Sequence, residues 1–470
     1  MSDVSYQAVM GRKNQIMKAA VGLDYAQFER EGIAFDYESM MASSNLNIGD
    51  VMDVMASFNV GNTPLAELKN ITALARRYAK SGFGARIMVK DEACNPSGSF
   101  KARRAALSVH IAKKLGYKGV ITATSGNYGA AVASCCAKAG LKCIVVQECF
   151  DSGGKGQPEI IEKARKCEAL GAEVIQLSVG PELFYVFLRL LEQTGYFNAS
   201  LYTPFAIQGV ESLGYEIALQ CRAQFGKDPD MVVATNAGGG NLTGTARGLL
   251  QAGCKAPVVA ASVDLKGLHM ASDTQFNRKS FTTGHTGFGM PFTTWPDRSD
   301  VPRSAARPLR YMQRYVTVTQ GEVFYTTEML AVLEGMERGP AGNTSLTAAF
   351  SLAQELPEDA ILVVQETEYT GAGKHQNAQL AFARENGIEI KIGDPRVQTP
   401  GQTIVLPKDP KQIKAVEVDI NRLRRSFINN AFVKDVRLPD EATLAYLAAE
   451  INLPVEGTRA LIENMLEESK

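Results

Sequence analysis

The feature of this sequence that most constrains its fold is an alternation of short apolar runs with longer segments of helical pattern. The apolar runs are continuous and rich in Val and Ile, which is typical of parallel strands covered on both faces. They are Arg86–Lys90, Gly119–Thr124, Lys142–Glu148, Glu173–Ser178, Met231–Thr235, Val258–Val263 and Ala360–Gln365. The helical patterns between them are Lys101–Leu115, Tyr128–Ala139, Pro158–Leu170, Glu182–Thr194 and Gly209–Phe225. This order predicts βαβ units, and therefore an α/β chain of doubly wound parallel sheets.

The composition is that of a soluble globular enzyme, because 45% of the 470 residues are hydrophobic and 21% are charged. Fifty basic residues balance fifty acidic ones, so no global field favours nucleic acid or a membrane surface. Eight cysteines without CxxC spacing and only four histidines predict reduced thiols and no metal site. Residues 1–23 lack the apolar core of a signal peptide, and no segment has the length of a membrane span. We therefore expect a cytoplasmic protein.

The first motif with chemical meaning is the turn that leads into Lys101. Gly98 and Ser99 permit a tight turn, Phe100 is apolar, and a helix is predicted to start at the lysine. Burial at such a point lowers the pKa of an amine and makes it a nucleophile that can form a Schiff base. A solvated lysine in an ordinary strand-to-helix loop is the alternative.

The second motif follows the strand that ends at Thr124 and opens an alanine-rich helix. It is Ser125-Gly126-Asn127-Tyr128-Gly129. Backbone amides at a helix N-terminus attract anions such as a substrate carboxylate, and the Asn127 amide can donate to a phenolate oxygen. A simple N-cap and turn would use the same residues.

The third motif is a glycine-rich loop directly after the strand Met231–Thr235. It is Gly238-Gly239-Gly240-Asn241-Leu242-Thr243, and it opens a helix. Three consecutive glycines expose backbone amides that can surround a phosphate. Thr243 stands where a dinucleotide fingerprint has its last glycine, and the Gly-Lys-Ser/Thr of a P-loop is absent. The loop therefore suits a single phosphate better than a nucleotide.

The fourth motif is Thr370-Gly371-Ala372-Gly373-Lys374, shortly after the last predicted strand. The Thr370 hydroxyl can hydrogen-bond a pyridine nitrogen, and Glu366 or Glu368 can take that role instead. A nucleophilic lysine, a donor for a phenolate and bare amides for a phosphate together predict pyridoxal phosphate as the cofactor.

In this order and spacing, the motifs resemble those of the fold-type-II pyridoxal-phosphate family, the group of tryptophan synthase β, cysteine synthase and threonine synthase. The resemblance covers residues 60–400. It implies two doubly wound parallel-sheet domains with the cofactor in the cleft, plus helical extensions at both termini. The implied limits are 1–60 for the N-terminal extension, 61–100 with 206–400 for the large cofactor-binding domain, 101–205 for the small domain and 401–470 for the C-terminal appendage.

The resemblance also implies roles for the motif residues. Lys101 carries the cofactor, Asn127 bonds its 3′ oxygen, and the backbone of Gly238–Thr243 holds its phosphate. Thr370 faces the ring nitrogen, and the loop Ser125 to Gly129 meets the substrate carboxylate. One departure is that Ala102 follows the lysine where threonine synthases usually have Asp.

Further segments carry a closer resemblance. They are Ser5-Tyr6-Gln7-Ala8-Val9-Met10, Gly32-Ile33-Ala34-Phe35-Asp36-Tyr37, Gly61-Asn62-Thr63-Pro64-Leu65 and Gly180-Pro181-Glu182-Leu183-Phe184-Tyr185. Through them the chain resembles the β subunits of 2-amino-4-oxopentanoate thiolases. That resemblance implies an oligomer with a small α subunit, and cleavage of 2-amino-4-oxopentanoate by coenzyme A to alanine and acetyl-CoA in ornithine degradation.

Two other functions stay open at this point. One is a threonine synthase-like or cysteate synthase-like enzyme for β or γ elimination or replacement. The other is a non-catalytic subunit that binds amino acids, against which the intact Lys101 argues. His285 is a candidate for activating the thiol, and a basic patch for coenzyme A is predicted at Arg298, Arg303, Arg307 and Arg310.

Overall fold

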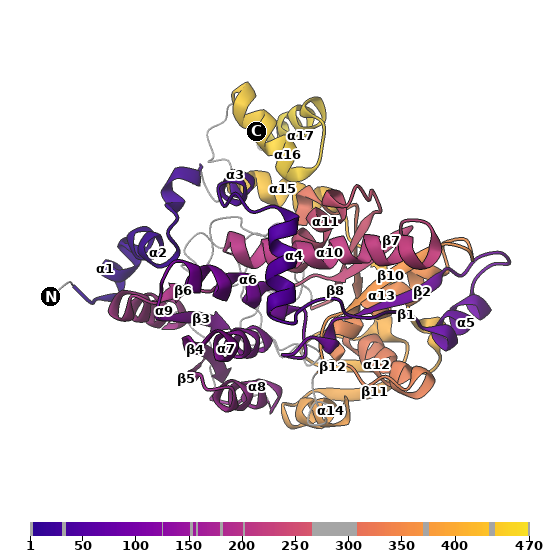
Figure 1. Cartoon of the computed structure of the whole chain (residues 1–470). Helices are drawn as coiled ribbons and strands as arrows, with labels where there is room; N and C mark the ends of the chain where they lie inside the picture. Colours follow the sequence, from indigo (N-terminus) through magenta and orange to yellow (C-terminus); the bar gives the residue numbers. More distant parts are fainter. Residues whose placement is uncertain are drawn as a thin grey trace.

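The computed structural model describes residues 3–30, 34–124, 126–150, 154–156, 158–178, 182–200, 203–265, 308–369, 376–431 and 438–468. Two sheets organise this part of the chain. In Figure 1 the smaller sheet lies at the lower left and the larger one at the right. A further pair of strands, β11 (Glu389–Gly393) and β12 (Thr403–Pro407), forms a parallel ribbon.

The large sheet has seven strands in the order β1-β2-β10-β7-β8-β9-β13. The five central strands are parallel, and the two edge strands β1 and β13 are antiparallel to their neighbours. The bounds are β1 Leu65–Glu67, β2 Arg86–Asp91, β7 Met231–Thr235, β8 Val258–Val263, β9 Arg314–Val318, β10 Ile361–Glu366 and β13 Val416–Glu417. Strands β2, β7, β8 and β10 are buried along nearly their whole length, which explains their largely continuous apolar sequences.

The small sheet has four parallel strands in the order β5-β4-β3-β6. Their bounds are β3 Gly119–Thr124, β4 Lys142–Phe150, β5 Glu173–Ser178 and β6 Phe197–Asn198. Strand order is not chain order in either sheet, so both are doubly wound. This confirms the predicted fold class.

Helices cover both faces of both sheets. Around the small sheet lie α1 (Tyr6–Gly11), α2 (Lys13–Val21), α3 (Tyr37–Ala42), α4 (Ile48–Ser57), α6 (Lys101–Lys114), α7 (Asn127–Ala139), α8 (Pro158–Ala169) and α9 (Glu182–Thr194). Around the large sheet lie α5 (Lys69–Tyr78), α10 (Pro204–Phe225), α11 (Gly240–Gln251), α12 (Gln320–Glu334), α13 (Pro340–Ala353) and α15 (Ile420–Ala431), while α14 (Gln376–Glu385) packs on the ribbon. The last two helices, α16 (Glu441–Ile451) and α17 (Val455–Glu468), pack on α15 (Figure 1).

Local sequence signals explain where several helices begin. Helix α10 starts with Thr203 as N-cap and Pro204 in its first turn, and it ends at Gly226 in the left-handed region. Helix α12 has a complete capping box formed by Thr319 and Glu322. These signals fix the helices that flank the large sheet.

Helices α10 and α11 approach each other unusually closely because glycines line their contact. A Cβ atom at Gly214 would collide with the backbone oxygen of Thr245, and one at Gly248 with that of Glu211. Since α11 begins at the glycine-rich loop, this close packing also fixes the position of that loop.

The structure differs from the sequence-based expectation at several strands. Strand β9 lies in a region where no strand was predicted, and residues 403–417 of the C-terminal extension contain the short strands β12 and β13 before the expected helices begin. Strand β9 pairs with β8 and β13, which lie far from it along the chain, so local pattern does not reveal it, whereas β12 pairs with the nearby β11. Within the described residues, none of the helices is long and apolar enough to cross a membrane.

Candidate active site

Lys101 is the first residue of α6, and its turn is bonded to the chain that follows β10. The Phe100 N–H donates to the Thr367 carbonyl oxygen at 3.0 Å, and the Tyr369 N–H donates to the Gly98 carbonyl oxygen at 2.8 Å. Gly98 has a φ of +78°, a conformation that favours glycine. The turn therefore holds Lys101 at the carboxyl end of β10, where open α/β sheets bind ligands.

The environment of Lys101 favours a neutral amine. Burial lowers its pKa to about 8; the Glu368 carboxylate opposes this shift, and the nearby cations Lys163 and Arg104 reinforce it. The Lys101 Nζ lies 4.7 Å from the centroid of the Phe100 ring. An amine with this pKa is far more often deprotonated at neutral pH than an exposed lysine, so it is competent as a nucleophile.

The second motif forms the N-terminus of α7. Gly126 is the N-cap residue, and its N–H donates to the Thr124 Oγ1 at 3.0 Å. The Asn127 Nδ2 is buried, and among the described residues it has no hydrogen-bond partner. A buried amide donor of this kind fits an oxygen of a bound ligand.

Tyr128 and Gly129 face the protein interior. The Tyr128 side chain is buried, and a Cβ at Gly129 would lie 2.7 Å from the Val145 side chain on β4. The Gly129 N–H already donates to the Gly126 carbonyl oxygen at 3.0 Å, so of these two residues Tyr128 supplies the backbone amide for the predicted carboxylate site. Ser125 lies outside the described residues.

The glycine-rich loop joins β7 to α11. Gly239 is the N-cap of α11 with a φ of +86°, and the Thr243 N–H donates to its carbonyl oxygen at 3.0 Å. The Asn241 Nδ2 donates to the Gln365 Oε1 at 2.8 Å, and Leu242 is buried in the core, so these two side chains hold the loop in place. The backbone at Gly238, Gly239 and Gly240 carries no side chain that would obstruct a phosphate.

Arg104 brings a buried positive charge to this loop. It lies one turn after Lys101 on α6, and 4% of its surface is exposed. A Cβ at Gly240 would lie 2.6 Å from its Nη2 and 3.0 Å from its Nη1. The guanidinium therefore lies directly against the loop, where a phosphate would neutralise its charge. Together with the Asn127 amide, this arrangement fits pyridoxal phosphate.

Two acidic residues were predicted as alternatives to Thr370 for the ring nitrogen. Both oxygens of Glu366 are buried without a hydrogen-bond partner in the described part of the chain. Burial raises the pKa of Glu366 well above its usual value, and the carboxylates of Asp91 and Glu368 add to the shift. Glu368 instead influences the charge of Lys101. Thr370 lies outside the described residues, so the choice among the three stays a prediction.

The suggested coenzyme A residues are largely outside the described residues as well: His285, Arg298, Arg303 and Arg307. Arg310 is described, and its Nη1 forms an ion pair with the Glu450 Oε1 at 3.1 Å. This pair ties α16 to the short helical turn Pro308–Arg310 before β9, so Arg310 already serves a structural contact.

Sequence reasoning missed a buried ion-pair network behind the site. The Arg103 guanidinium bonds the Glu92 carboxylate at 2.7 Å and the Glu216 carboxylate at 2.8 Å, and the Lys90 Nζ bonds Glu216 at 2.9 Å. All four side chains are buried. Because Arg103 follows Lys101 by two residues, this network anchors the first turn of α6.

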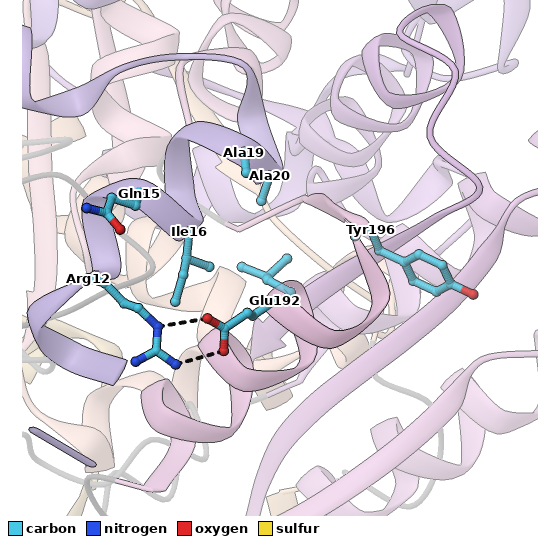
Figure 2. A pocket seen from close by; sticks show the side chains of 9 residues that line it. Arg12, Gln15, Ile16, Ala19, Ala20, Glu192 and Tyr196 are labelled. Atoms are coloured by element: carbon cyan, nitrogen blue, oxygen red, sulfur yellow. Dashed lines mark hydrogen bonds and ion pairs between the residues drawn. The ribbon is translucent and has the colours of Figure 1, made fainter. Parts of the chain in front are cut away.

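A separate pocket of about 260 Å³ lies between α2 and α9 (Figure 2). Figure 2 shows Arg12 and Glu192 joined across it, with the Arg12 Nε at 2.7 Å from the Glu192 Oε1. None of the motif residues lines this pocket. The pocket is therefore separate from the predicted site around Lys101.

Comparison with known proteins agrees with this site. The family described as "Pyridoxal-phosphate dependent enzyme" matches residues 56–366. The chain belongs to this family. Its cofactor is therefore pyridoxal phosphate, and the sequence-based prediction of both is confirmed.

Two relatives match this chain almost from end to end. A "2-amino-4-ketopentanoate thiolase beta subunit" of Acetoanaerobium sticklandii is 67% identical over 98% of this chain and 99% of its own. A protein of the same name from an unknown prokaryotic organism is 63% identical over 98% of both chains. Since ketopentanoate and oxopentanoate denote the same compound, the predicted closer resemblance is also confirmed.

A solved structure supports the fold. A threonine deaminase from an organism abbreviated T.th. is 25% identical, with a TM-score of 0.52 over 68% of this chain and 98% of the other. The similarity covers about two thirds of this chain, as expected for fold type II. The roles of the individual site residues and the domain limits stay predictions.

Proposed function

We propose that this chain is the cofactor-bearing β subunit of a thiolase that cleaves 2-amino-4-oxopentanoate with coenzyme A to alanine and acetyl-CoA. The observation that carries the proposal is the match to two thiolase β subunits over 98% of the chain, including both terminal extensions. Alignments to a threonine synthase and a tryptophan synthase cover 39% and 62% of it. The thiolase subunits therefore match far more of this chain than those two enzymes do.

The residues around Lys101 suit this reaction. Bound pyridoxal phosphate supplies a ring that accepts electrons from the amino acid attached to it. The backbone of Gly238–Thr243 and the Arg104 guanidinium hold its phosphate, and the Asn127 amide donates to its 3′ oxygen. Lys101 would hold it through its amine.

Lys101 also moves protons during turnover. When the Lys101 Nζ is not engaged with the cofactor, it would take the proton from the substrate Cα as general base. Its lowered pKa of about 8 lets it both accept and return a proton near neutral pH. Glu368 stabilises the charged form of the lysine between these two steps.

The bond that breaks lies between Cβ and Cγ of the substrate. The coenzyme A sulfur forms a bond to the Cγ carbonyl carbon, and the Cβ–Cγ bond then breaks, which releases acetyl-CoA. The electron pair left at Cβ takes up the proton that the thiol lost, and Cα regains its own proton from Lys101. The products are one alanine and one acetyl-CoA, so all atoms balance.

We further propose a small α subunit as partner and the cytoplasm as location. The partner follows from the words "beta subunit" in the names of both close relatives. All eight cysteines are free thiols and seven of them are buried, which suits a reducing compartment.

The test is a reconstituted reaction. The chain is purified together with the small subunit, loaded with pyridoxal phosphate, and mixed with 2-amino-4-oxopentanoate and coenzyme A. We expect acetyl-CoA and alanine in equal amounts, and neither product with Lys101→Ala. If no acetyl-CoA forms while another amino acid releases ammonia or phosphate, the threonine synthase-like alternative holds instead.

A further inference from the structure

A second lysine, Lys163 on α8, lies against the loop predicted to meet the substrate carboxylate. A Cβ at Gly126 would lie 2.5 Å from the Lys163 Cδ and 3.2 Å from its Nζ. The side chain therefore runs directly along the N-cap of α7, next to Asn127. A glycine at position 126 is what leaves room for it.

Lys163 is buried rather than solvated. The exposed fraction of Lys163 is 5%. Its ammonium forms an ion pair with Glu159, one turn earlier on α8, whose exposed fraction is 2%. Burial opposes its charge, but the carboxylates of Glu159 and Glu368 together raise its pKa. Lys163 thus stays a cation at the pH at which Lys101 begins to lose its proton.

Lys163 and Lys101 share one site. Lys163 and Glu368 both influence the charge of Lys101, and Glu368 also stabilises Lys163. The cluster of Lys101, Glu159, Lys163 and Glu368 draws its members from α6, α8 and the chain after β10. Lys101 loses its proton more easily than Lys163, so the two lysines suit different tasks.

We infer that the Lys163 ammonium binds the α-carboxylate of the amino acid substrate, beside the backbone amides at the N-terminus of α7. An ammonium held in a buried site forms strong charge-assisted hydrogen bonds to a carboxylate. Glu159 holds the ammonium in place through their ion pair on α8. The inference rests on the proposed function only in that the ligand is an amino acid, because every amino acid presents this carboxylate.

The alternative is an ion pair that only stabilises α8. A merely structural pair would affect all ligands alike, whereas a carboxylate-binding lysine affects only ligands that carry the carboxylate. Ligand discrimination therefore separates the two.

The experiment compares alanine with alaninamide, which lacks the negative charge, on the cofactor-loaded protein with its small subunit. Dissociation constants come from the change in visible absorbance on ligand binding. For Lys163→Gln we expect alanine to bind at least about tenfold more weakly, as the loss of a charged hydrogen bond predicts, and alaninamide to change by less than about threefold. Lys163→Arg should keep most of the preference for alanine.

Controls separate this effect from misfolding. Lys166→Gln is the matched variant, because Lys166 lies one turn further along α8 and donates to the Ser97 carbonyl oxygen at 2.7 Å; it should keep the wild-type preference. If Lys163→Gln does not fold, the double variant Glu159→Gln/Lys163→Gln is measured instead, because it also removes the Glu159 carboxylate that the single variant leaves buried without its partner. An unchanged ratio of the two constants, or equal weakening of both ligands, overturns the inference. If Lys163→Gln changes the ratio of the two dissociation constants but the acetyl-CoA assay fails, the proposed thiolysis is wrong and the inference about Lys163 stands.

Discussion

Arg104 offers a sharp prediction about how this protein holds its cofactor. The guanidinium is buried and lies within contact distance of Gly240 in the glycine-rich loop. Replacing it by glutamine removes a positive charge but keeps a polar side chain of similar reach. If the guanidinium donates to the cofactor phosphate, the substitution removes one charged hydrogen bond, or two if the contact is bidentate.

The magnitude follows from typical values for charged hydrogen bonds. A net loss of about 2 kcal/mol corresponds to a dissociation constant roughly 30-fold higher. Pyridoxal without the phosphate should bind Arg104→Gln within about threefold of its affinity for the wild type, because the lost group has no partner in that ligand. The ratio of the two affinities, rather than either alone, therefore reports the contact.

The assay is an equilibrium titration of the cofactor-free protein with pyridoxal phosphate and with pyridoxal, followed by visible absorbance. Arg104→Lys keeps the charge without the planar fork and should show an intermediate loss. Thermal unfolding of each variant checks that the fold is intact. An equal loss of affinity for both ligands would refute the reasoning, since it would mean that Arg104 shapes the site without touching the phosphate.

Three further predictions test the electrostatics and packing. The rate at which cofactor-free protein couples pyridoxal phosphate should rise with pH around a midpoint near 8, the pKa of Lys101. Glu368→Gln should lower that midpoint, because it removes the negative charge that raises the pKa of Lys101. Stopped-flow absorbance measures both rates. Burial alone would raise the pKa of Glu216, but Arg103 and Lys90 lower it from 4.5 to about 2. The stabilising contribution of Glu216 should therefore be complete above pH 4.5 and disappear as the pH falls toward 2. Urea unfolding at several pH values should show this loss of stability in the wild type and a smaller loss in Glu216→Gln. Gly248→Ala should cost about 1–3 kcal/mol in urea unfolding, because the added methyl group meets the backbone of α10; an unchanged midpoint would contradict the close helix contact.

Much of the fold could be predicted from the sequence because the central strands are buried on both faces. Met231–Thr235 and Val258–Val263 were predicted with the bounds that β7 and β8 have, since continuous Val-rich runs leave little ambiguity. Strand β9 was missed because Arg314–Val318 is short and includes the polar residues Arg314 and Thr317, so it is not a continuous apolar run. The short edge strands depend on partners far along the chain.

The candidate site was predictable where function depends on local motifs. Lys101, Asn127 and Gly238–Thr243 each begin a helix after a turn, which sequence spacing reveals. Arg104 and Lys163 were not identified as cations near Lys101, and Glu368 was considered only for the ring nitrogen, because only the tertiary fold brings these groups together. Gly126 was the one local signal for Lys163, since a residue without a Cβ is what admits that side chain.

The measurement that tests the central claim most directly is chemical trapping of the cofactor. Borohydride reduction of the yellow, cofactor-loaded protein, followed by proteolysis and mass spectrometry, identifies the lysine that carries pyridoxal phosphate. The account predicts a single labelled peptide that contains Lys101, and no label in Lys101→Ala. Label on the neighbouring Lys163, or no labelled peptide from the wild type, would contradict it.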